Sequence, residues 1–146
     1  MALSGWLGER GVRRMLGAAV AVDAGYWAAW YGHRSWVATG TGSAYVEFEN
    51  AFLLADTWLA LSCLLAWRSL RLRRPAALLW LLVAGGAGLY LLAMDVLYDL
   101  QHGIYTRGSG GLVELAVNAL TLVFSVSALD WAWSHRAQLS GTHERG

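Results

Sequence analysis

The chain has 146 residues, the length of one domain, so residues 1–146 are treated as a single unit. Hydrophobic residues make up 57% of it and charged residues only 14%, whereas a soluble domain carries about a quarter charged residues, which points to a protein of the lipid bilayer. The net charge of +1 gives no basis for nucleic-acid binding, and the single cysteine, Cys63, excludes an intrachain disulfide and a multi-thiolate metal site.

Four apolar segments are long enough to cross a hydrocarbon core of about 30 Å as helices. They span about 15–31, 48–67, 76–98 and 112–133. Backbone groups in lipid must find their partners within the segment, so we expect helices and no strands. The connections are short, so neighbouring helices should be antiparallel. The sequence therefore predicts an all-α integral membrane four-helix bundle with up-down-up-down topology.

Arginine placement predicts the orientation of this bundle. All 11 basic residues are arginines, and nine of them fall on one side of the four-span topology. The positive-inside rule then places both termini and the middle loop in the cytoplasm, in a membrane of the bacterial inner-membrane type. The nine are Arg10, Arg13, Arg14, Arg68, Arg71, Arg73, Arg74, Arg136 and Arg145.

Acidic residues gather in the opposite, outer half of the predicted bundle. An ionisable side chain within a span costs several kcal/mol unless it faces protein, a partner or water, so such residues are functional candidates. The third and fourth spans are joined by a short hairpin, which lets their polar faces meet. We therefore expect one polar binding site, formed by Asp56, Asp95, Glu114, Asn118 and Asp23.

Three interpretations of this set stay open. The carboxylates can be protonated and simply hydrogen-bonded, can hold a metal ion, or can bind an organic amine or relay protons. Oxygen ligands suit calcium, magnesium or manganese, so a divalent metal is the cofactor to consider. Its candidate ligands are Asp95, Asp99 and His102, the last of which follows the acidic face of the third span.

Three sequence segments resemble those of small uncharacterised four-span bacterial membrane proteins. They are FENAFLLADTW (48–58), MDVLYDLQHGIY (94–105) and VELAVNALTL (113–122). The resemblance implies the four-span fold and no chemistry.

The sequence favours a non-enzymatic membrane protein that binds a small cation or cationic compound, or that serves as an accessory subunit. Its expected partners are the lipid bilayer and a membrane protein or a second copy of the chain, and no nucleic acid. The alternative is a membrane enzyme with lipid-directed acid/base or metal-dependent chemistry at the outer leaflet, using Asp95, Asp99 or His102. No Ser-His-Asp spacing, HExxH or paired-cysteine motif supports that alternative.

Overall fold

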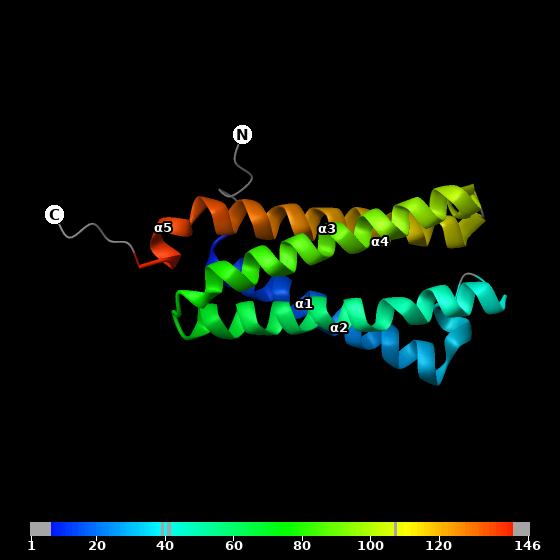
Figure 1. Cartoon of the computed structure of the whole chain (residues 1–146), viewed down its shortest axis with the longest axis horizontal. Helices are drawn as coiled ribbons and strands as arrows, with labels where there is room; N and C mark the ends of the chain where they lie inside the picture. The colour runs from blue at the N-terminus through cyan, green and yellow to red at the C-terminus, as the bar shows by residue number, and fades with distance from the viewer. Residues whose placement is uncertain (1–6, 39, 41, 107, 142–146) are drawn as a thin grey trace.

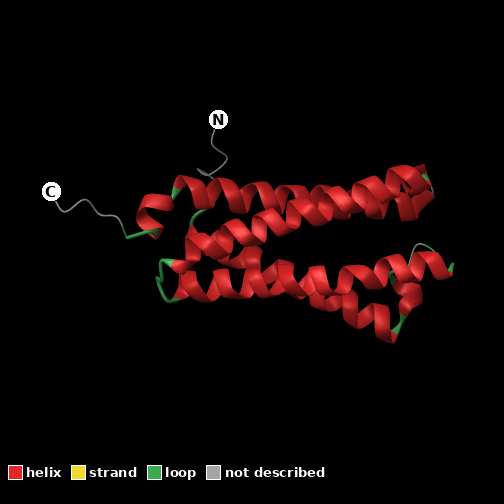
Figure 2. Cartoon of the chain, viewed as in Figure 1, coloured by secondary structure: helices red, strands yellow, loops and turns green. Residues whose placement is uncertain are grey.

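Four long helices make up most of the protein in the computed structural model, which describes residues 7–38, 40, 42–106 and 108–141. The long helices are α1 (Glu9–Gly32), α2 (Ser43–Arg71), α3 (Ala76–His102) and α4 (Gly108–Ser134). Three short elements are η2 (Arg34–Trp36), η3 (Ile104–Thr106) and α5 (Arg136–Leu139). The long helices lie roughly along the long axis of the molecule (Figure 1), and every element among the described residues is helical, as predicted (Figure 2).

Three of these helices, α2, α3 and α4, are long and apolar enough to cross a membrane, which suggests a membrane protein. Large apolar side chains stand on their surfaces, among them Leu54, which is 81% exposed, and Leu120, which is 69% exposed. The helix α1 is not in this group, because Asp23 and several glycine, tyrosine and tryptophan residues dilute its apolar run. The 24 residues of α1 are long enough to cross a membrane, but its composition leaves it outside this group, and the span 15–31 stays a prediction.

The helices extend beyond the apolar runs predicted for them. The runs 15–31, 48–67, 76–98 and 112–133 lie inside Glu9–Gly32, Ser43–Arg71, Ala76–His102 and Gly108–Ser134. Local residues fix two of the ends. Pro75 precedes α3 with φ −57°, a value its ring already imposes. Gly103 ends α3 with φ +61°, a left-handed conformation that glycine adopts without strain.

Glycines bring α3 and α4 close together near the middle of the bundle. A Cβ added at Gly85 would lie 2.6 Å from Cγ of Leu129, and one at Gly88 would clash with the hydroxyl of Ser125. Small residues let helix backbones approach and gain dispersion contacts, which matters in lipid because the hydrophobic effect does not drive helices together there. This contact fixes the spacing of the two helices that carry most of the candidate site.

The two ends of the bundle are packed differently. The arginine end, defined as the end that holds the start of α1, the α2–α3 turn and the end of α4 (Figure 1), has a core of largely small and aliphatic side chains such as Leu16 and Leu81. At the opposite end, Trp27, Trp30 and Tyr45 form a separate aromatic cluster between α1 and α2. The opposite end therefore surrounds its polar groups with rings that carry N–H and O–H donors.

Candidate functional site

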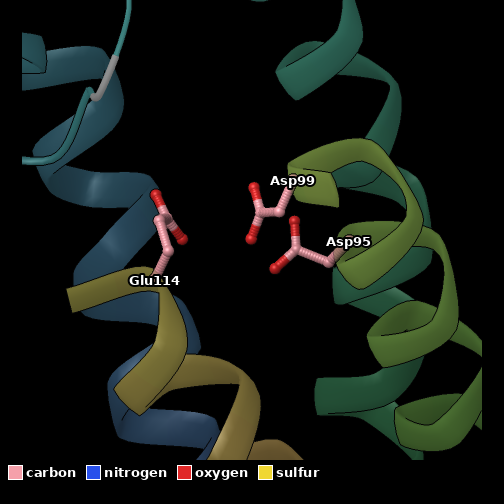
Figure 3. Close-up of side chains that lie close together, drawn as sticks. All are labelled: Asp95, Asp99 and Glu114. Atoms are coloured by element: carbon pink, nitrogen blue, oxygen red, sulfur yellow. The ribbon is translucent and has the colours of Figure 1, made fainter. Parts of the chain in front are cut away.

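Three carboxylates face one another at the opposite end of the bundle, between α3 and α4. Asp95 and Asp99 point from α3 toward Glu114 on α4 (Figure 3). One oxygen of each lies within 4.8 Å of an oxygen of both others. Asp99 is only 3% exposed, whereas Asp95 and Glu114 are partly exposed. We call Asp95, Asp99 and Glu114 the carboxylate triad.

Asn118 and Tyr105 hold the buried member of the triad. The Asn118 amide Nδ2 donates hydrogen bonds to Oδ2 of Asp99, at 3.1 Å, and to the hydroxyl of Tyr105, at 2.8 Å. The Tyr105 hydroxyl is in turn hydrogen-bonded to Asp99, and Asn118 is hydrogen-bonded to Asp95. Burial and the nearby Asp99 carboxylate raise the pKa of the Tyr105 phenol, so this hydroxyl remains a donor at neutral pH.

Helix periodicity places the four polar side chains of α3 and α4. Residues four apart lie on the same face of a helix, so Asp95 is stacked on Asp99 in α3, and Glu114 on Asn118 in α4. Because α3 and α4 are consecutive and pack closely, these two polar faces meet. The triad is therefore built largely from local periodicity and a single helix–helix contact.

The turn between α3 and α4 places Tyr105. After Gly103 leaves the helix with a left-handed φ, the chain forms η3 and returns directly to α4. A Cβ added at Gly111 would lie 2.5 Å from the carbonyl oxygen of Ile104 and 2.7 Å from that of Tyr105. Only a glycine at this position lets η3 lie against the first turn of α4. From η3 the Tyr105 hydroxyl then reaches Asn118, further along α4.

A second polar group lies between α1 and α2. The indole Nε1 of Trp27 donates to Oδ2 of Asp56 at 3.1 Å, and the side chain of Trp27 is also hydrogen-bonded to Asp23. The two carboxylates are close enough to repel each other. The two carboxylates thus share one neutral aromatic donor, the indole of Trp27.

Two further hydrogen bonds join α1 to α2 in the same region. The hydroxyl of Tyr26 donates to Oε2 of Glu49 at 2.7 Å, and Nε1 of Trp30 donates to Oδ1 of Asn50 at 3.0 Å. Trp30 is fully buried, so its bond is shielded from water. In each of these bonds the aromatic donor belongs to α1 and the acceptor to α2.

The five predicted binding residues therefore fall into two groups. Asp95, Glu114 and Asn118 come together at the triad, whereas Asp23 and Asp56 meet at the indole of Trp27, between α1 and α2. The groups remain within electrostatic range, since the carboxylate of Asp56 interacts with that of Asp95. The acids at this end of the bundle thus form one polar region with two distinct centres.

His102, a predicted metal candidate, lies beside the triad. Its Nδ1 is 2.9 Å from the carbonyl oxygen of Tyr98, and its ring stacks on the Tyr98 ring with centroids 4.0 Å apart. The side chain is exposed. In the described part of the chain, the candidate ligand group contains Asp95 and Asp99 with Glu114 in place of His102.

The sequence pattern did not identify two of the site residues, Trp27 and Tyr105. Trp27 stands four residues after Asp23 on the same helix face, a spacing that offered a signal for the pair. The position of Tyr105 depends on the backbone path through η3. The neighbouring glycines were the only sign of this path in the sequence. Aromatic residues are common near membrane interfaces even where no ligand binds, so the sequence offered no reason to assign hydrogen-bonding roles to Trp27 and Tyr105.

No protein-family model, curated protein or solved structure matches this chain. Three carboxylates at short range, with a neutral amide and a phenol as supports, offer hard oxygen ligands of the kind that calcium, magnesium and manganese prefer.

Proposed function

We propose that the chain is a multi-pass protein of a bacterial-type inner membrane that binds a divalent cation at the carboxylate triad. In this proposal α1 spans the bilayer together with α2, α3 and α4, and both termini are cytoplasmic. The arginine end then faces the cytoplasm and the triad opens toward the outside. The positions of Arg10, Arg71, Arg74 and Arg136 at one end of the bundle support this orientation.

The observation that carries the proposal is the short separation of three carboxylates. Two ionised carboxylates 4.8 Å apart repel by about 3 kcal/mol at an effective dielectric constant of 20. Three such groups cannot all remain charged unless something compensates them. A cation held between them converts the repulsion into attraction, whereas proton uptake only removes it.

Asn118 and Tyr105 serve as positioning residues in this proposal. They orient Asp99 through hydrogen bonds, and neither supplies a negative charge. Partners that orient a ligand in this way typically contribute about 10- to 100-fold to metal affinity. Asp95 and Glu114 are partly exposed, so a cation can reach the triad while keeping some of its water ligands.

Calorimetric titration of the purified protein in mild detergent tests the proposal, with manganese and calcium as separate probes. Asp95→Asn, Asp99→Asn and Glu114→Gln should each weaken binding roughly tenfold or more. Glu47→Gln is the matched control, because Glu47 is an exposed acid of α2 outside the triad.

The control variant should bind as the wild type does, and all variants should keep their helix content by circular dichroism. A wild type that takes up neither probe would contradict the metal proposal. Uptake of an organic amine under the same conditions, lost in the same three variants, would reassign the site to a cationic compound. Equal binding by all variants would show that the triad is not the site.

A further inference from the structure

A basic groove lies at the arginine end of the bundle, at the other end from the triad. It has a volume of about 480 Å³ and is open to the surface. Its walls come from the start of α1 and the end of α2. The lining residues are Arg10, Arg13, Arg14, Gly17, Trp67 and Arg71. We call it the arginine groove.

Helix periodicity explains why so many arginines meet in this groove. Arg10, Arg13, Arg14 and Gly17 follow the spacing i, i+3, i+4 and i+7, which places them on one face of α1. That face lies beside the last turns of α2, where Arg71 extends its guanidinium over the Trp67 ring, 5.5 Å from the ring centroid. Four guanidinium groups from two helices therefore converge on one groove.

Little negative charge compensates these arginines within the described residues. Arg13 makes an ion pair with Glu9, with 3.6 Å between Nε and Oε1. Both side chains are substantially exposed, so the pair contributes little. Four arginines against this one paired glutamate leave a surplus of three positive charges. An anion would therefore be attracted to the groove.

The surface changes from charged to apolar toward the middle of the bundle. Gly17 faces open space, since a Cβ added there would meet nothing within 4 Å. Leu64 is 48% exposed. It shares a face of α2 with Trp67, three residues further along the chain, and with Arg71, seven residues further along. On α1 the same face continues from Gly17 to the exposed Ala21. A ligand that fits must be anionic at one end and apolar along the rest.

We propose that the arginine groove binds an anionic phospholipid, with its phosphate between Arg14 and Arg71 and an acyl chain along Gly17 and Leu64. Guanidinium groups form paired hydrogen bonds to phosphate oxygens, which suits arginine better than lysine. The Trp67 ring would lie at the level of the headgroup, as tryptophans at membrane interfaces do. Basic pockets between membrane helices bind such headgroups. This inference goes beyond the cation site and uses none of its residues.

Native mass spectrometry of the full chain, released from mild detergent, tests the inference. The probes are phosphatidylglycerol and phosphatidylcholine with identical acyl chains, and inorganic phosphate. The wild type should retain phosphatidylglycerol more tightly than phosphatidylcholine. The variant Arg14→Gln/Arg71→Gln should weaken this retention roughly tenfold or more. The variant Arg73→Gln/Arg74→Gln loses the same charge at the same end, outside the groove, and should bind nearly as the wild type does.

Gly17→Leu tests the shape of the groove without changing its charge. The leucine has space to enter the groove and should displace the acyl chain, so phosphatidylglycerol retention should fall while helix content is kept. Equal retention of the two lipids, or equal losses of retention in the two double variants, would overturn the inference. Either result would show that lipids are attracted by the general charge of this surface and not by a specific groove. Competition by inorganic phosphate as strong as that by phosphatidylglycerol would overturn the lipid assignment in favour of a free phosphate.

Discussion

Gly85→Ala tests the close approach of α3 and α4. The added Cβ would lie 2.6 Å from Cγ and 2.9 Å from Cδ2 of Leu129, and 3.1 Å from the carbonyl oxygen of Ser125. That carbonyl belongs to the backbone of α4 and cannot rotate away, so the helices must separate or Leu129 must leave its rotamer. Overpacking of this size costs about 1–3 kcal/mol of the free energy of unfolding.

The neighbouring Gly86 supplies a matched control. A Cβ added there meets nothing within 4 Å, so Gly86→Ala should be neutral or should stabilise the helix by up to about 1 kcal/mol, because alanine is the better helix former. We expect the free energies of unfolding of the two variants to differ by about 2 kcal/mol. Equilibrium unfolding in detergent micelles, followed by circular dichroism, measures this difference.

A second variant separates the helix contact from a general effect of the substitution. Gly85→Ala/Leu129→Ala removes the leucine atoms closest to the new methyl group, so the double variant should lose less stability than the two single losses added together. If Gly85→Ala unfolds with the same free energy as Gly86→Ala, the explanation of the α3–α4 contact by glycine is refuted.

Two further predictions concern the polar groups. In Gly111→Ala the added Cβ would lie 2.7 Å from the carbonyl oxygen of Tyr105, so the start of α4 must move from η3, and calorimetry should show weaker cation binding at nearly unchanged helix content. Trp27→Phe removes the donor to Asp56 and should cost about 1–3 kcal/mol. Trp36→Phe is the control, because Trp36 is 75% exposed, and it should change the free energy of unfolding by less than about 0.5 kcal/mol. Equal changes in the unfolding temperature of the two tryptophan variants would contradict the role of the Trp27 hydrogen bond.

Much of the helical architecture could be predicted because long apolar runs admit few alternatives in lipid. The three helices α2, α3 and α4 contain the predicted runs, and Pro75 and Gly103 mark the two ends of α3. The helix ends were less predictable. Residues 43–47, which include the polar Ser43 and Glu47, continue the helix beyond the apolar run, and hydrophobicity alone does not reveal this.

Part of the candidate site also followed from periodicity. The i, i+4 pairs in α3 and α4 indicated two polar faces, and the short hairpin between the helices brings those faces together. The division of the acids into two centres could not be predicted, because it depends on where the Trp27 indole lies between α1 and α2. Side-chain packing of this kind is set by the tertiary structure and leaves no regular pattern in the sequence.

The direction of the hydrogen bonds between α1 and α2 has a consequence for biogenesis. Tyr26, Trp27 and Trp30 on α1 all donate to acceptors on α2, whereas Asp23 has its hydrogen-bond partner, Trp27, on its own helix. In the proposed four-span topology, a nascent α1 that entered lipid alone would leave these three donors without their acceptors, at a cost of several kcal/mol for each polar group. The translocon should therefore release the first two helices into the bilayer together as a hairpin, after α2 has been synthesised.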